Sequence, residues 1–162
     1  MLSRKGSMVV LFLIAFVNLL VFYSILRYTS YGTRDIFIMV FAVIGMCVMG
    51  IAHFVKENAL VLGYSKENLF LYSHYMFYMS MLLIGFMSSN KVLMLYGLYL
   101  VNMATTMKLM NDGCIYNQLH DNNWVAGNWV LDDYVNEIQA EHVSITLNTV
   151  IIGRLVYMEF KK

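Results

Sequence analysis

Two pairs of side chains in this sequence have the residue types that bind metals or act as nucleophile and base. Cys114 and His120 are six positions apart, and a thiol beside an imidazole is the pairing of a cysteine nucleophile with its base. Cys-x5-His is not a usual zinc spacing, and zinc would need two further ligands. Cys114 also follows the predicted C-terminal end of a helix, which does not stabilise a thiolate. We therefore expect no enzyme activity here and assign the stretch to the polar end of a membrane helix.

The second pair is His53 and His74. His53 lies near the end of one long apolar run and His74 near the start of the next, so a membrane would hold both at similar depth. Histidines on facing helices hold haem or metals in helical bundles. The alternative is two neutral histidines that hydrogen-bond near the lipid headgroups. We favour the second interpretation and predict no cofactor, with a haem or metal at His53 and His74 as the less favoured reading.

The elements that would position these side chains are four apolar runs of bilayer length. About 20 helical residues cross about 30 Å of hydrocarbon. Of the 162 residues, 60% are hydrophobic and 13% are charged, which is far more apolar than an ordinary soluble domain. The sequence therefore predicts an all-α integral membrane protein with four transmembrane helices. The runs are Met8–Leu26, Ile36–Val55, Leu69–Met87 and Val92–Met110.

Charge and motif content exclude several functional classes. The formal net charge is +1 and the basic residues are scattered, so there is no nucleic-acid-binding patch. The chain has no P-loop, GxSxG or HExxH motif, so no small-molecule substrate is indicated. Counting basic residues on the two sides of four spans gives five on the N-terminal side and three opposite, a weak preference for a cytoplasmic N-terminus.

The last fifty residues differ from the rest. The sequence predicts two parts, a four-helix transmembrane domain over 1–112 and an interfacial or soluble segment over 113–162. Apolar residues from Val143 to Met158 recur at helical spacing. Arg154 lies within this stretch, and an arginine at a bilayer centre costs about 2.5–3.5 kcal/mol. We expect an amphipathic helix on the membrane surface or against a partner, with a fifth span as the alternative.

Two asparagines fall near the middle of predicted spans. Asn18 is in the first run and Asn102 in the fourth. An amide without a partner in hydrocarbon is costly. We therefore expect Asn18 and Asn102 to join the first and fourth helices, with each interhelical hydrogen bond contributing on the order of 0.6–2 kcal/mol.

The stretch Gly113–His120, GCIYNQLH, carries a resemblance. It resembles a motif of small multi-spanning membrane proteins of unknown function in large DNA viruses and bacteria, which reads approximately Gly-Cys-apolar-x-Thr-x-Leu-Glu. Gly113, Cys114, Ile115 and Leu119 match, whereas Asn117 and His120 stand where the motif has Thr and Glu. The resemblance implies a small helical membrane protein without an assigned reaction, and it favours a viral source.

These observations lead to one expected function and two alternatives. We expect a structural, multi-pass membrane protein of a large assembly, favoured as a virion inner-membrane or minor capsid-associated protein that links bilayer to protein shell. The alternatives are an accessory subunit of a respiratory or other energy-converting complex in an organelle inner membrane, and a small transporter or channel. The expected partners are lipid and other protein subunits. The residues expected to dock a partner are Trp124, Trp129, Asp132, Asp133, Glu137 and Arg154.

Overall fold

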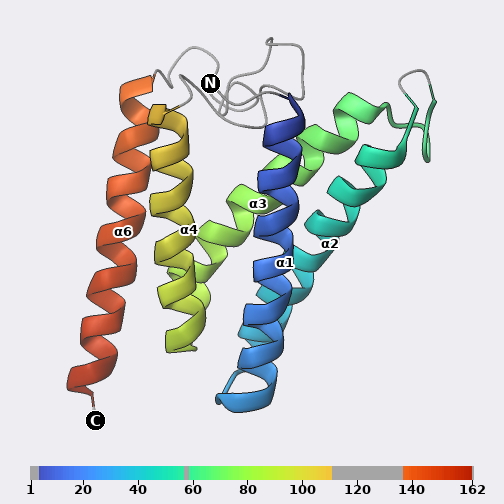
Figure 1. Ribbon diagram of the computed structural model, residues 1–162. Coiled ribbons are helices and arrows are strands. Elements are labelled where there is room, and N and C mark those ends of the chain that lie inside the picture. Colours follow the sequence, from blue (N-terminus) through green and yellow to red (C-terminus); the bar gives the residue numbers. More distant parts are fainter. Residues whose placement is uncertain (1–3, 57–58, 111–136, 162) are drawn as a thin grey trace.

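The structure, a computed structural model, describes residues 4–56, 59–110 and 137–161 (Figure 1). This part of the chain is all-α, which confirms the predicted fold class, and each predicted apolar run lies in a helix of its own. The helices extend up to four residues beyond the apolar runs into polar ends, except that α2 ends at Phe54, one residue before the end of its run. They are α1 (Arg4–Tyr28), α2 (Thr33–Phe54), α3 (Lys66–Met87), α4 (Lys91–Met110) and α6 (Glu137–Phe160).

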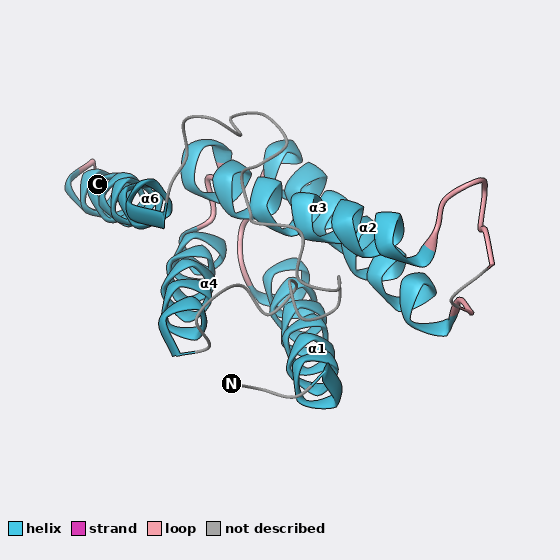
Figure 2. Cartoon of the chain, turned by 90° about the horizontal axis from the view of Figure 1, so that it is seen from above, coloured by secondary structure: helices cyan, strands magenta, loops and turns pink. Residues whose placement is uncertain are grey.

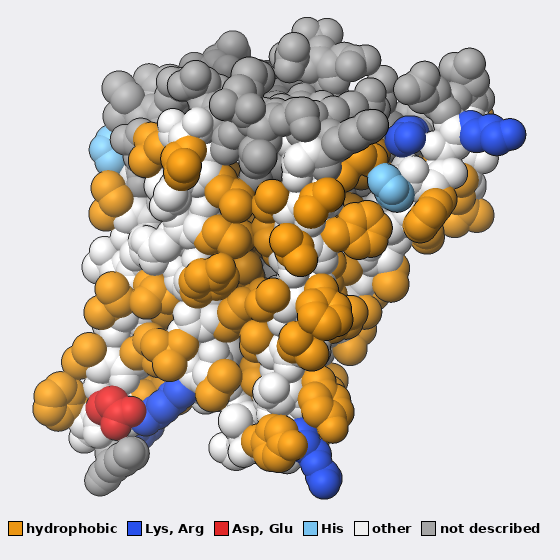
Figure 3. Space-filling view, in the orientation of Figure 1, with side chains coloured by type: hydrophobic (Ala, Val, Ile, Leu, Met, Phe, Trp, Pro, Cys, Tyr) orange, Lys and Arg blue, Asp and Glu red, His pale blue; other side chains and the backbone are white. Residues whose placement is uncertain are grey.

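The helices have the length and apolar surface of membrane spans. Among the described residues, four stretches meet the length and apolarity of a bilayer span, in α1, α2, α3 and α6 but not α4: Gly6–Tyr28, Thr33–Phe54, Asn68–Met87 and His142–Phe160. The fourth helix in the chain, α4, has 20 residues and is therefore about 30 Å long. Figure 3 shows hydrophobic side chains over the middle of the visible face and charged side chains near its two ends. This distribution agrees with a multi-pass membrane protein.

The bundle consists of two helix pairs and one further helix (Figures 1 and 2). The helices α2 and α3 make the most extensive contact, and α4 packs along α6. The helix α3 contacts α2, α4 and α6, so it links the two pairs. The helix α1 makes fewer contacts, with α4 and α2, and much of its apolar surface is exposed. An exposed apolar surface on a membrane helix is a surface for lipid.

The closest helix approach that a glycine permits is between α3 and α4. A Cβ atom added at Gly97 would lie 2.4 Å from Cγ2 of Ile84. Ile84 is 1% exposed and belongs to the core between α1, α2, α3 and α4. Gly97 therefore lets the two helix axes come closer than any larger residue would allow.

The connection between α2 and α3 contains a tight two-residue turn. Val61 and Tyr64 exchange both backbone hydrogen bonds at 3.0 Å. The two central residues have positive φ angles, 53° at Leu62 and 83° at Gly63. This is the geometry of a type I′ turn, in which glycine is unstrained and a branched leucine is not.

The helix α6 meets the requirements of the fifth-span alternative. Leu147 and Ile151 are buried against the bundle, while Ile145, Ile152 and Val156 are exposed on other sides of the helix. The outward face is therefore not the polar face that a helix on a membrane surface needs. Leu147 shares a core with residues of α3 and α4, so helices on both sides of residue 113 form one packed unit.

A fifth span changes the charge count that orients the protein. The first residues of α1 and the last residues of α6 lie at opposite ends of the bundle (Figure 1). If all five helices are counted as spans, Arg154, Lys161 and Lys162 are assigned to the side opposite the N-terminus, which gives six basic residues there against five. The charge count of a five-span topology does not favour a cytoplasmic N-terminus.

Candidate functional site

The largest group of interacting polar side chains lies at the end of the bundle where α1 meets α2 and α3 meets α4. We call this group the polar clamp. Its members come from two loops and two helices, and hydrogen bonds among them join residues 50 to 70 positions apart in the sequence. The polar clamp consists of Thr29, Gly32, Asp35, Ser88, Ser89, Asn90 and Arg154.

Asp35 is the centre of the polar clamp. It is fully buried and accepts four hydrogen bonds. One carboxylate oxygen accepts from the Ser88 hydroxyl at 2.7 Å and the Ser89 backbone N–H at 3.0 Å. The other accepts from the Ser89 hydroxyl at 2.7 Å and the Gly32 backbone N–H at 2.9 Å. Asp35 also lies in the first turn of α2, where the helix dipole stabilises a negative charge. These donors replace the water that a buried carboxylate has lost.

Asn90 also hydrogen-bonds the α3–α4 loop to the α1–α2 loop. Its amide nitrogen donates to the Thr29 hydroxyl at 2.6 Å and to the Ser30 carbonyl at 2.7 Å. Its amide oxygen accepts from the Leu93 backbone N–H at 3.0 Å, which caps the first turn of α4. The Asn90 side chain therefore caps the N-terminus of α4 and hydrogen-bonds it to the residues that follow α1.

Arg154 brings α6 into the polar clamp. Its guanidinium donates to the backbone carbonyls of Gly85 and Ser88, at the C-terminal end of α3. Those carbonyls lie at the negative end of the α3 helix dipole, which attracts a positive charge. The planar guanidinium can donate one hydrogen bond to each carbonyl at the same time. One turn further along α6, Glu159 forms an ion pair with Lys91 of α4. The charged group of Arg154, a residue predicted to dock a partner protein, is thus bound by the end of α3 in the same chain, and the docking role stays a prediction.

The polar clamp is a structural arrangement. The acceptor positions of Asp35 are occupied by four donors, and the two N–H donors of the Asn90 amide are both used. Proton transfer or metal binding needs a carboxylate with a free lone pair facing a cavity, and this one has neither. Its effect is to hold the ends of all five described helices in a fixed arrangement.

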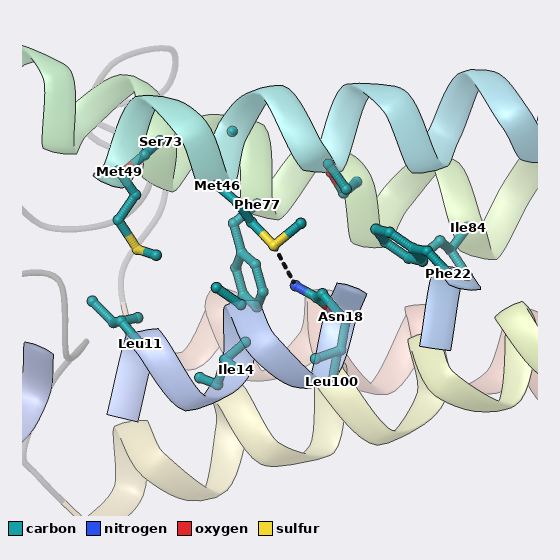
Figure 4. A pocket seen from close by; sticks show the side chains of 14 residues that line it. Leu11, Ile14, Asn18, Phe22, Met46, Met49, Ser73, Phe77, Ile84 and Leu100 are labelled. Carbon is teal, nitrogen blue, oxygen red and sulfur yellow. Dashed lines mark hydrogen bonds between the residues drawn. The ribbon is translucent and has the colours of Figure 1, made fainter. Parts of the chain in front are cut away.

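A second polar position lies deeper in the bundle, beside a small cavity between α1, α2 and α3 (Figure 4). Asn18 of α1 points toward Met46 of α2, and its amide nitrogen lies 3.5 Å from the Met46 sulfur. The Tyr96 hydroxyl of α4 donates to the amide oxygen of Asn18. Asn18 therefore joins α1 to α4, the helix pair that the sequence indicated.

The cavity itself is small. It has a volume of about 30 Å³, enough for one or two water molecules. Ser73 and Ser80 also line it, but each donates its hydroxyl to a backbone carbonyl of its own helix, Phe70 and Met76 respectively. This cavity has no room for a substrate or a cofactor.

Asn102 joins a different pair of helices from the pair expected. Its amide exchanges two hydrogen bonds with the amide of Asn148 on α6, at 3.2 and 3.1 Å. One turn away, the Thr105 hydroxyl donates to the Ser144 hydroxyl at 3.0 Å. The sequence placed the partner of Asn102 on the first helix. The actual partner is on α6, because the seam between α4 and α6 runs along that face of α4.

The two histidines have separate aromatic environments. His53 packs against Phe12 of α1, with ring centroids 5.4 Å apart. His74 is fully buried, and its ring lies 5.0 Å from that of Tyr78. Among the residues that the structure describes, no three His, Cys, Asp or Glu side chains gather in a group able to hold a metal ion. Each imidazole is packed as a core or interfacial residue.

Several predicted residues lie outside the described part of the chain. These are the Gly113–His120 motif with Cys114 and His120, and the docking residues Trp124, Trp129, Asp132 and Asp133. Glu137 is the first residue of α6, but its side chain is not described. Sequence reasoning did not identify Asp35. A signal was present in the sequence, because Asp35 is three residues after Gly32, the spacing between the N-cap residue of a helix and the acidic residue of a capping box.

Comparison with known proteins adds no relative. No protein-family model, no curated protein and no solved structure matches the chain. The resemblance at Gly113–His120 therefore stays a prediction.

Proposed function

We propose that this chain is a structural membrane protein that anchors other proteins of a large assembly to a bilayer. One observation carries the proposal. In the described part of the chain, the polar side chains of the polar clamp hydrogen-bond helices and loops to one another, and its central carboxylate, Asp35, is fully buried. A bundle whose polar groups hydrogen-bond its helices to one another is suited to keeping a fixed structure in lipid.

The protein contacts would come from the connection between α4 and α6. Met110 ends α4 and Glu137 begins α6 at the same end of the bundle, so the intervening segment is tethered there on both sides (Figure 1). By sequence this segment contains Trp124, Trp129, Asp132 and Asp133. Aromatic residues supply much of the binding energy in protein interfaces. The favoured setting is the internal membrane of a virion, where this segment would link the bilayer to the shell.

The test is cross-linking and mass spectrometry of the full chain, purified from its native source in mild detergent. We expect cross-links from shell proteins to residues 121–141. The double variant Asp132→Asn with Asp133→Asn should recover less of those proteins. Arg27→Gln changes one exposed charge at the opposite end of the bundle and should recover them as well as the natural chain. Recovery of redox-complex subunits instead, or of the chain alone, would contradict the proposal.

A further inference from the structure

The exposed side of α4, which borders the seam with α6 at Asn102, has an unusual pattern. Its exposed residues follow one another at steps of three and four, the spacing of the a and d positions of a coiled coil. At 3.6 residues per turn they fall within an arc of about 100° on one side of the helix. We call this face the outer stripe. It consists of Val92, Leu95, Tyr99, Asn102, Thr106 and Leu109.

The centre of the outer stripe is polar. Asn102 is exposed, and it lies about 17 Å along the helix from Lys91, near the middle of the bilayer. The apolar members Leu95 and Tyr99 are 55% and 57% exposed. Lipid suits those two residues, but hydrocarbon offers no hydrogen bond to an amide that has donor or acceptor capacity left. A face with this composition is satisfied better by another helix than by lipid.

The amides at this position have hydrogen-bonding capacity left. In the described part of the chain, both N–H groups of Asn102 are used, on the Leu98 carbonyl and on Asn148. The amide nitrogen of Asn148 donates only to Asn102, which leaves it one N–H. Each amide oxygen has also accepted only one bond and can accept a second. The pair thus offers both a donor and acceptors at the edge of the outer stripe.

We propose that the outer stripe is the contact surface for a second copy of this chain. Copies of one membrane protein insert with the same orientation, so a two-fold axis between them runs along the membrane normal. The α4 helices of two copies are then parallel, and every stripe residue meets itself at the same depth. Asn102 and Asn148 of one copy face the same pair of the other, and the free N–H of each Asn148 finds an amide oxygen.

Self-association explains the observation better than a different partner does. A different protein would need its own polar residue at the depth of Asn102, whereas a second copy supplies it automatically. A single asparagine in an apolar seam also fixes the register and the number of helices that associate. The inference is independent of the proposed anchoring function, because it concerns the lipid-facing side of α4 and not the α4–α6 connection.

The test is disulfide cross-linking of single cysteines in membranes. The full-length chain is first changed to Cys47→Ser with Cys114→Ser, and one cysteine is then introduced at Leu95, Tyr99 or Thr106. Leu13 and Leu20 of α1 are the matched controls, since they are 59% and 50% exposed but lie on a different helix. We expect disulfide-linked dimers from the three stripe positions and few from the two controls.

Three results would overturn the proposal. They are equal dimer formation at the control positions, no dimer at any stripe position, and stripe cross-links only to a protein of different mass. A second measurement does not depend on cysteines. Thr106→Leu keeps the helix and removes a small polar stripe residue, whereas Asn102→Leu removes the amide. From the strength of interhelical hydrogen bonds, Asn102→Leu should weaken dimerisation in detergent roughly 3- to 20-fold, and Thr106→Leu less. A dimer unaffected by Asn102→Leu would exclude the role of the amide.

Discussion

Replacing Asp35 with asparagine tests whether the polar clamp holds the bundle together. The two side chains have the same shape, so the change alters only charge and hydrogen bonding. Each carboxylate oxygen of Asp35 accepts one backbone N–H, from Ser89 on one side and from Gly32 on the other. Whichever way the asparagine amide turns, its NH2 group therefore faces a backbone N–H. The two serine hydroxyls can rotate to accept, but a backbone N–H cannot.

The expected loss follows from those contacts. A hydrogen bond to a charged group contributes about 1.5–3 kcal/mol, and a buried N–H left without a partner costs about 1–3 kcal/mol. The variant also loses the charge that interacts favourably with the N-terminal end of α2. We expect Asp35→Asn to lower the free energy of unfolding by about 3 kcal/mol. Ser89→Ala removes only one hydroxyl donor to the carboxylate, on an exposed residue, and should cost about 1.5 kcal/mol, the lower end of that range.

The assay is unfolding of the purified protein in mild detergent by a denaturing detergent or urea, followed by helical circular dichroism. The control is Ser30→Ala, because Ser30 is exposed and contributes only its backbone carbonyl to the polar clamp. It should unfold like the natural chain. An Asp35→Asn protein within about 0.5 kcal/mol of the natural one, the usual effect of a surface change, would refute the reasoning.

Three further predictions use the same assay. Gly97→Ala should destabilise the protein by about 1–3 kcal/mol, because its Cβ would lie 2.4 Å from Ile84. The control Gly50→Ala has no atom within 4 Å of the new Cβ and should be neutral or slightly stabilising, so equal effects of the two changes would contradict the close packing at Gly97. Arg154→Lys should cost about 1.5–3 kcal/mol, since an ammonium keeps the charge but cannot bridge two carbonyls, and an unchanged stability would show that the bridge is not formed. Leu62→Asn should stabilise the protein by about 1 kcal/mol, because asparagine tolerates the positive φ of Leu62 and the leucine side chain, 93% exposed, loses little packing. A loss of stability would show that Leu62 makes a contact that stabilises the fold by more than its backbone strain costs.

The helices could be predicted from sequence because a membrane span is a local property. A run of about 20 apolar residues meets the length and solvation requirement without reference to any other part of the chain. The first run, Met8–Leu26, accordingly lies inside α1, Arg4–Tyr28. The polar ends extend the helices beyond the runs, as where Ser65 accepts from the Asn68 backbone N–H at the start of α3.

The polar clamp could not be predicted in the same way, because it depends on which loops meet. Asp35 stands at the edge of an apolar run, beside Arg34, and resembles an ordinary loop charge. Its burial follows only when the α3–α4 loop delivers Ser88 and Ser89, more than fifty positions away. The asparagines illustrate the same limit. Their composition predicts that each needs a partner, but only the packing determines that Asn102 finds Asn148.

Arg154 shows most clearly how a local cost can be misjudged. Its insertion cost favours a helix outside the bilayer when the residue is considered alone. That cost refers to an arginine with lipid around it. In the folded chain the guanidinium meets the last carbonyls of α3, groups that a helix end leaves without intrahelical partners. The Arg154 guanidinium and the carbonyls at the end of α3 thus satisfy each other's hydrogen bonds. A charged residue in an apolar stretch therefore does not exclude a membrane span when another helix ends at the same depth.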